Sequence, residues 1–407
     1  MRKSEFYARA RSDLAGPLAG VRVVEATTTW AGPMCGCVLA DLGADVIKVE
    51  HPAGEVSRRV PPILPGTSLS FMHATVNRNK RSLTLDLRDA DGRDVFLKLA
   101  ATADVVVENF RPGTAARWGV GFSDVERVRP DIVYVSISGY GQFGPDADRP
   151  GYDPMAQAAS GWLSLNGEPG GPPVKAPTFI GDDVAGLHGA IAALAALRHR
   201  DRTAEGQYVD VALQDCLVFQ SNGYPTLAAM GMDLPRLGSQ FMVAAPAGVF
   251  ECADGFVMAG VLLDAHWKVL ARLVGRPELA EHPDWVTAAA RVSRREQANA
   301  LLAEFARTRT RAELTHLFLS EQLPISPVRS YGDAAADPHL RERDMLLPCA
   351  LEDGSEAPAV GPPAKFSRTP TSVRTAAAAL GAHTDELLDE IGITPDARAR
   401  LRERGIV

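Results

Sequence analysis

The stretch of sequence that decides the fold is LAGVRVVEATTTWAGPMCGCVLADLGADVIKVEH, residues 18–51. Within it, residues 21–27 form an apolar, β-branched run that predicts a buried strand. Residues 34–43 predict a helix that ends on Gly43, and residues 45–50 predict a second strand. A strand, a helix and a strand in direct succession indicate two parallel strands joined by a crossover helix.

The same alternation continues through the first half of the chain. We predict strands at 82–87, 104–110 and 132–141, a helix at 92–103, and a strand followed by a helix at 206–216. Residues 143–180 are rich in Gly and Pro and predict a long loop, and residues 184–200 predict a helix. Nearly continuous apolar strands favour a sheet covered on both faces, so we expect an α/β fold with a Rossmann-like parallel sheet.

At 407 residues the chain is longer than one hydrophobic core usually supports, so we expect two domains. A large domain is predicted at residues 1–224, a smaller α+β domain at 225–330, and a segment that returns to the large domain at 331–407, with short strands and a last helix. In the small domain we predict a hairpin at 246–262, turning at Ala253-Asp254-Gly255, and helices at 265–275, 293–310 and 311–322.

Composition and charge narrow the class of protein. Hydrophobic residues make up 46% and charged residues 23%, as in ordinary globular enzymes, and the net charge of −7 argues against nucleic-acid binding. We expect no apolar run that approaches the roughly 20 residues needed to span a bilayer, and the charged start does not resemble a signal peptide, so we expect a cytoplasmic location and no membrane partner. The five scattered cysteines form no zinc-type pair; we expect free buried thiols and no metal.

Basic side chains follow several of the predicted strands. His51, Arg88, Arg111 and Arg117 each come at or just after a strand end. Because ligands bind at the carboxyl ends of parallel strands, these four side chains predict a site for a phosphorylated ligand, although solvated surface charge would give the same pattern. The first turn carries no GxGxxG, which argues against a nucleotide cofactor and a dehydrogenase.

Asp182 is the other candidate. It follows a short strand-like run at 178–181 and opens the predicted helix at 184–200. Aspartate is a common N-cap residue, and either Asp182 or Asp183 could cap the helix while the other faces a pocket.

The chain resembles the family III CoA-transferases, the CaiB/BaiF family, over essentially its whole length. The resemblance rests on many segments in order: LAGVRVVEATTTWAGP, LGADVIKVEHPAGE, NRNKRSLTLDLR, ADVVVENFRPG, SISGYGQFGP, RPGYDPMAQAASG, FIGDDVAGLHGAIAALAAL, GQYVDVALQD, LPISPVRS, DPHLRERDM and LGAHTDELLDEIGI. It implies that Asp182, in the step Gly181-Asp182, is the nucleophile, with Asp183 as its rival. It also implies CoA contacts at Trp30, Ala31, His51, Leu85, Asp86, Leu87, Arg88, Asn109, Phe110, Arg111, Arg117, Ser138, Gly139, Tyr140 and Gly141.

The resemblance implies an activity. The chain would move CoA between an acyl-CoA donor and a carboxylic acid acceptor through an aspartyl anhydride and an aspartyl-CoA thioester, with CoA as substrate and without metal or nucleotide cofactor. An interlocked homodimer is implied as well.

Two departures from the family pattern bear on the activity. The region 258–267 holds one glycine instead of the run found in formyl- and oxalyl-CoA specialists, which argues against those acids. Tyr152 stands where racemases of this fold carry a histidine base, which argues against a 2-methylacyl-CoA racemase-like isomerase. That isomerase, with His73 or His188 as base, stays open as an alternative, as does a CoA-ester-binding protein without transferase turnover.

Overall fold

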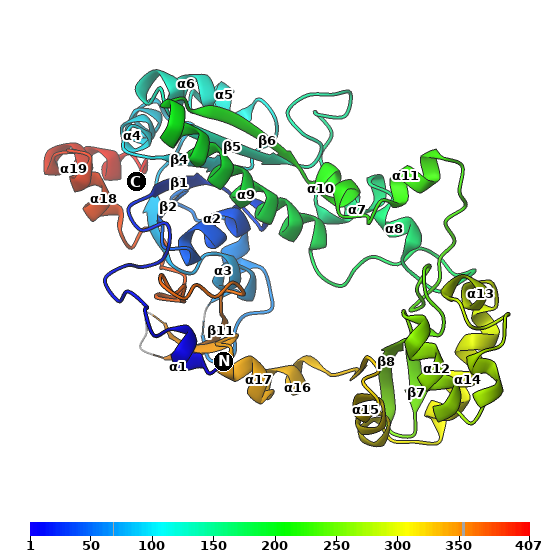
Figure 1. Ribbon diagram of the computed structural model, residues 1–407. Helices are drawn as coiled ribbons and strands as arrows, with labels where there is room; N and C mark the ends of the chain where they lie inside the picture. The colour runs from blue at the N-terminus through cyan, green and yellow to red at the C-terminus, as the bar shows by residue number, and fades with distance from the viewer. Residues whose placement is uncertain (68, 352–354) are drawn as a thin grey trace. The chain divides into compact units, whose positions relative to one another are not determined.

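The computed structural model describes residues 1–67, 69–351 and 355–407 (Figure 1). The chain forms two compact units. Unit 1 comprises Met1–Leu163, Lys175–Gly231 and Pro338–Val407, and unit 2 comprises Ser164–Val174 and Met232–Asp337. Residues 164–174, which lie within the long loop expected from the sequence, therefore belong to unit 2.

Unit 1 is built on a six-stranded parallel sheet with the strand order β3-β2-β1-β4-β5-β6. Its strands are β1 (Arg22–Ala26), β2 (Asp45–Glu50), β3 (Lys80–Thr84), β4 (Val105–Glu108), β5 (Val133–Ser138) and β6 (Gln207–Ala212). This is the doubly wound order, so the predicted Rossmann-like sheet is confirmed. β3 begins and ends earlier than the predicted 82–87, and residues 85–87 lie beyond the strand.

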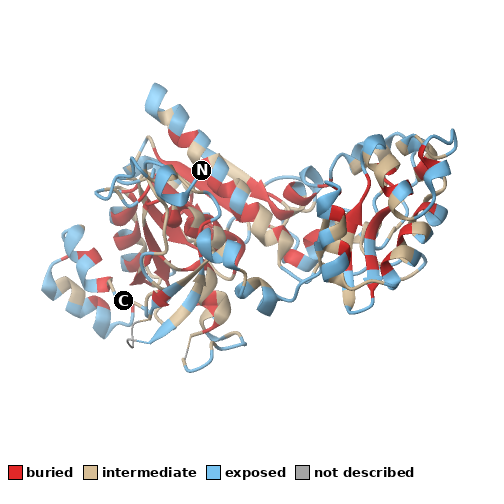
Figure 2. Ribbon diagram, turned by 60° about the horizontal axis from the view of Figure 1, so that its bottom comes forward, coloured by how far each residue is buried: buried red, intermediate tan, exposed pale blue. Residues whose placement is uncertain are grey.

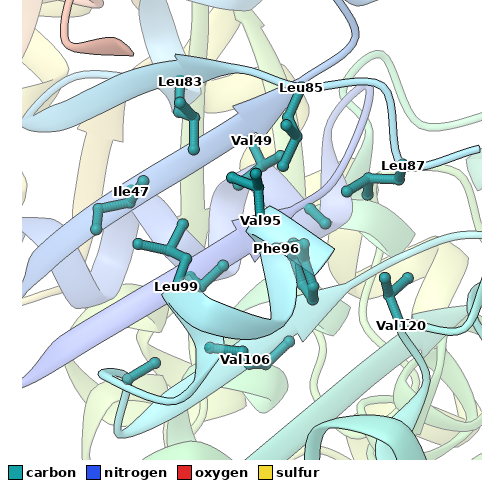
Figure 3. Packing of buried hydrophobic residues seen from close by; sticks show 14 of the residues in the cluster. Ile47, Val49, Leu83, Leu85, Leu87, Val95, Phe96, Leu99, Val106 and Val120 are labelled. Carbon is teal, nitrogen blue, oxygen red and sulfur yellow. The ribbon is translucent and has the colours of Figure 1, made fainter. Parts of the chain in front are cut away.

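Helices cover both faces of the sheet (Figure 1). Alternate strand residues such as Val23, Val105 and Val135 pack with α2 (Ala31–Asp41), α9 (Ile180–Thr203) and α10 (Leu213–Phe219). The other alternation, including Val24 and Ile47, packs with α4 (Ala90–Ala100), α6 (Phe122–Val128), α18 (Thr384–Glu390) and α19 (Pro395–Glu403). Figure 3 shows this second cluster around Ile47, Leu83, Phe96 and Leu99, and in Figure 2 the strands of the sheet are buried.

The segment before Asp182 differs from the sequence prediction. The expected loop at 143–180 contains α7 (Asp153–Ala159) and α8 (Trp162–Leu165). The strand-like run at 178–181 is not a strand, because α9 already begins at Ile180. Neither Asp182 nor Asp183 is the predicted N-cap: both lie in the first turn of the helix, and its N-cap position is Phe179.

Helix α9 is also more apolar than the sequence analysis allowed. Among the described residues it is the one helix whose length and hydropathy match a membrane span. Its buried residues pack against α2 and β5 in the core of unit 1. Packing inside this unit accounts for the apolar composition of the helix.

Unit 2 has its own core around a three-stranded antiparallel sheet of β7 (Ala247–Cys252), β8 (Gly255–Gly260) and β9 (Ile325–Pro327). The predicted hairpin is confirmed by the β7–β8 pairing. Its helices are α12 (Asp264–Leu273), α13 (Ala288–Ser293), α14 (Arg295–Arg307), α15 (Arg311–Ser320), α16 (Tyr331–Ala335) and the 3₁₀ turn η2 (Pro277–Ala280).

The remaining elements of the chain are short. They are α1 (Lys3–Phe6), η1 (Val56–Arg59), α3 (Phe71–Val76), α5 (Thr114–Trp118), α11 (Tyr224–Ala229), α17 (Pro338–Glu342), β10 (Leu346–Ala350) and β11 (Glu356–Val360). The tail ends in two helices, α18 and α19, where the sequence predicted one. All five cysteines are free and buried, as predicted.

Candidate active site

A cavity of about 340 Å³ opens in unit 1 where the strand order reverses between β1 and β4. This switch point is where open parallel sheets bind ligands. The cavity is lined by residues at or after the ends of β1, β4 and β5, together with the first turns of α9 and α10 and the segment before α7: Thr28, Thr29, Ala31, Asn109, Phe110, Arg111, Pro112, Thr114, Ile137, Ser138, Gly139, Ala147, Arg149, Pro150, Gly151, Tyr152, Asp182 and Leu213. Asp182 thus shares one cavity with Ala31, Asn109, Phe110, Arg111, Ser138 and Gly139 from the predicted set.

The carboxylate of Asp182 is half-buried and makes no hydrogen bond within the described part of the chain. Burial raises its pKa to about 7, and the negative charges of Asp153 and Asp183 add to the effect. An unengaged carboxylate that faces a cavity is available as a nucleophile.

Asp183, the rival candidate, is engaged. Its Oδ1 accepts a hydrogen bond from Trp30 Nε1 at 2.6 Å. Burial raises the pKa of Asp183, while that hydrogen bond opposes the shift. The buried Trp30 ring also packs against Phe179, with 5.1 Å between ring centroids. Trp30 therefore links the turn after β1 to the first turn of α9 through Asp183, whereas Asp182 lines the cavity.

The turn after β1 is held on two sides. Asn109 receives a hydrogen bond from the Thr28 N–H at 2.8 Å and donates one to the Thr28 carbonyl at 2.9 Å. Thr29 has a left-handed φ of 63°, and its N–H donates to Glu55 Oε2 at 2.8 Å. Asn109 thus acts on the cavity wall through the backbone, and Glu55, which sequence reasoning missed, stabilises a strained residue of that wall.

Behind this wall lies a buried network of charges. Lys48 Nζ is 3.2 Å from Glu55 and 3.3 Å from Glu25, and Lys80 Nζ is 2.7 Å from Glu25. Burial alone would raise the pKa of Glu55, but the Lys48 charge and several hydrogen bonds outweigh it and hold that pKa below its usual range. Charged residues at positions 25, 48 and 80 inside otherwise apolar strands were the signal that could have revealed the network.

His51, Asp86 and Arg88 form a second group at the ends of β2 and β3. Arg88 donates to both Asp86 oxygens at 2.8 and 2.7 Å, and His51 Nε2 lies 3.5 Å from Asp86. The hydrogen bonds from Arg88 hold the pKa of Asp86 at about 2. The predicted contacts Leu85 and Leu87 place their side chains in the core (Figure 3), so a ligand could meet only their backbone.

The two other basic candidates follow β4 and are exposed. Arg111 lines the cavity and donates to the Asp148 carbonyl at 3.0 Å. Arg117 lies in α5 and donates to Thr114 Oγ1 at 2.8 Å. The structure therefore brings His51 and Arg88 into one group, whereas Arg111 and Arg117 lie on the segment that follows β4.

The Ser138–Gly141 turn follows β5. The Ser138 hydroxyl accepts the Gly141 N–H at 3.0 Å, and Gly141 has a φ of 88°, a conformation that favours glycine. Tyr140 carries Arg149 over its ring at 5.2 Å. Arg149 lines the cavity but had no signal in the sequence.

The histidines considered as racemase bases lie elsewhere. His73 is buried in the charge network, 3.1 Å from Ser57 and Asn77. His188 packs on Phe219, with ring centroids 5.4 Å apart. Along the described parts of the chain no histidine lines the cavity of Asp182, and Tyr152 is there instead. No cluster of three or more His, Cys, Asp or Glu among the described residues could hold a metal.

Comparison with known proteins gives consistent relatives. The family model described as CoA-transferase family III matches residues 18–384. The chain is 37% identical to the succinyl-CoA–L-malate CoA-transferase beta subunit of Chloroflexus aurantiacus, over 96% of this chain and 98% of that protein. It is 36% identical to the succinyl-CoA:mesaconate CoA-transferase of Haloarcula marismortui, over 93% and 97%. The crystal structure of a CaiB/BaiF family protein from Brucella suis has a TM-score of 0.81 and 34% identity, over 93% and 100%.

Proposed function

The chain belongs to CoA-transferase family III and is an enzyme of that family, and we propose that it moves CoA between two carboxylic acids through covalent intermediates on Asp182. The observation that carries this proposal is the Asp182 carboxylate, which faces the switch-point cavity without a hydrogen-bond partner among the described residues. Its neighbour Asp183 is engaged by Trp30, which favours Asp182 over Asp183 as the nucleophile.

The steps follow from carboxylate chemistry. An Asp182 oxygen attacks the thioester carbonyl of the donor, the C–S bond breaks, and CoA leaves as thiolate from an aspartyl anhydride. The thiolate attacks the Asp182 carbonyl carbon, which frees the first acid and leaves an aspartyl-CoA thioester. The carboxylate of the second acid attacks this thioester and expels CoA, which then attacks the acyl carbonyl of the new anhydride. The new acyl-CoA departs, and Asp182 is a carboxylate again.

For the acids we propose the dicarboxylic class. The names of two relatives pair succinyl-CoA with malate or mesaconate, each a dicarboxylic acid. The described cavity lining adds two cations, Arg111 and Arg149, and a guanidinium suits a phosphate of CoA or the distal carboxylate of such an acid. We also propose a homodimer in the cytoplasm; since one relative is a beta subunit, mass measurement of the purified chain would show whether it assembles alone.

The covalent mechanism is tested by hydroxylamine trapping. The enzyme is mixed with succinyl-CoA, glutaryl-CoA or butyryl-CoA, quenched with hydroxylamine and weighed intact. Hydroxylamine converts an activated aspartyl carbonyl to a hydroxamate, a gain of about 15 Da. We expect the gain on the Asp182 peptide with the two dicarboxylic thioesters, its loss in Asp182→Ala, and its retention in the control Asp183→Asn. A wild-type enzyme that binds these thioesters and never gains mass would contradict the nucleophile assignment.

A further inference from the structure

Asp153 is a buried acid with a place in the site that the mechanism above does not use. It opens α7, is 1% exposed and lies 28 residues before Gly181. Its Oδ1 accepts the Gly181 N–H at 2.7 Å, and its Oδ2 accepts Gln157 Nε2 at 2.8 Å. Both oxygens are acceptors, the arrangement of a carboxylate, and no Lys, Arg or His forms a salt bridge with it among the residues that the structure describes.

The contact reaches Asp182 through its own peptide. The Gly181 N–H that Asp153 holds belongs to the residue directly before the nucleophile. The fit is close, since a Cβ added to Gly181 would lie 3.1 Å from Asp153 Oδ1 and 3.1 Å from Leu217 Cδ1. Asp153 therefore holds the backbone of the first turn of α9 in place directly before Asp182.

Within the described residues, hydrogen bonds but no salt bridge stabilise the charge of Asp153. Of the elements packed against α9, α2 carries Asp41, β6 carries Asp210 and α10 carries Asp215, all acidic. Burial raises the pKa of Asp182, and the negative charges of Asp153 and the adjacent Asp183 raise it further. Asp183 shares its charge with the Trp30 N–H.

We propose that Asp153 is a positioning residue whose buried negative charge drives Asp182 toward its acylated states. This inference rests on the proposed function of Asp182. In the free enzyme two carboxylates oppose each other, whereas the anhydride and the aspartyl-CoA thioester are neutral at Asp182. Forming either bond removes the repulsion, so the neighbour destabilises the free carboxylate and leaves the intermediates unaffected. The same repulsion makes Asp182 a stronger base and a better nucleophile.

The proposal links two measurements. Asp153→Asn keeps an oxygen to accept the Gly181 N–H and removes the charge. The pH midpoint of kcat/KM, followed by chromatography of the CoA esters, should fall by on the order of one pH unit. At pH 9, where Asp182 is ionised in both proteins, the equilibrium ratio of aspartyl-CoA enzyme to free enzyme should fall by the same factor, about tenfold for each unit of midpoint shift.

Gln157→Met is the matched control, because it leaves the charge of Asp153 and removes the hydrogen bond to Oδ2, together with the one that Gln157 Oε1 accepts from the Ala176 N–H. We expect it to keep the wild-type midpoint. The inference is overturned if Asp153→Asn still forms the hydroxamate at Asp182 but keeps the wild-type pH midpoint of kcat/KM and the wild-type ratio of aspartyl-CoA enzyme to free enzyme. It is also overturned if Gln157→Met shifts both quantities as much as Asp153→Asn does. Should Asp153→Asn fail to fold, Asp153→Glu, which keeps the charge, must keep the wild-type midpoint, and a lowered midpoint there would overturn it. If the wild-type enzyme forms no hydroxamate at Asp182, the result would instead contradict the proposed function itself.

Discussion

Replacing Asp182 by Asn should stabilise the protein at the pH at which it destroys the activity. The pKa of Asp182 is raised by burial from 3.8 to about 7, a difference of about three units. Each unit corresponds to about 1.4 kcal/mol, so the ionised carboxylate costs the folded state at most about 4 kcal/mol, and about 1–3 kcal/mol after allowance for its partial exposure. Asn has the same shape and carries no charge.

The sign of the pH dependence follows from linkage. The folded state binds the proton of Asp182 more tightly than the unfolded state does, so stability is lost as pH rises from about 4 to about 7 and the full cost is present above 7. The advantage of Asp182→Asn should therefore be largest at pH 8 and fall to less than half by pH 5.

Thermal unfolding followed by circular dichroism at pH 8 and pH 5 measures this effect. We expect the Tm of Asp182→Asn to exceed that of the wild type by about 2–6 °C at pH 8. Asp201→Asn changes an exposed aspartate near the other end of α9 and serves as the control, with no pH-dependent difference. An Asp182→Asn protein that is no more stable at pH 8, or equally stabilised at both pH values, would refute the account of the buried charge.

Further predictions concern the turn after β1, which Glu55 holds, and the first turn of α9. Because the nucleophile must be ionised, kcat/KM should fall about tenfold for each pH unit below 7, and a flat steady-state profile from pH 5 to 8 would contradict the raised pKa. Glu55→Gln leaves Lys48 without one of its partners and should cost about 3–5 kcal/mol, measured by urea unfolding; a loss below about 1 kcal/mol would show that the network relaxes. Gly181→Ala should lower kcat at least about tenfold in a folded protein, because its Cβ would displace Asp153. Gly332→Ala, whose added Cβ would lie 3.6 Å from Ser330 Oγ, is its control and should match the wild type in kcat.

The parallel sheet could be predicted because its information is local. Apolar β-branched runs mark β1, β2 and β4 within two residues at each end and the start of β5 within one, and Gly43 follows the end of the first helical segment. The limits of α9 were missed for a local reason too. Asp182 and Asp183 look like caps, but burial and the contact with Trp30 place them inside the first turn.

The chemistry of the site was only partly accessible to sequence reasoning. The resemblance to the family pointed to Asp182, and its cavity includes Asn109 and Arg111 from the same prediction. Contacts between distant residues carried no local signal. The Glu55 hydrogen bond to Thr29 spans 26 residues, and the Asp153 hydrogen bond to Gly181 spans 28. Such pairs become visible only when the fold has set both partners in place.

The helices α18 and α19, which cover one face of the sheet, can form their contacts only late in the synthesis of the chain. The N–H of Thr84, at the end of β3, donates a hydrogen bond to Thr384, which is synthesised 300 residues later. The Asp86 N–H donates to the carbonyl of Ile406, which follows later still. At about 5–20 residues per second, a ribosome needs roughly 15–60 s to bridge that gap. During this interval Leu83 and Phe96 lack the cover of Leu387 and Leu388. Each nascent chain therefore carries an open, aggregation-prone apolar surface until α18 and α19 have been synthesised.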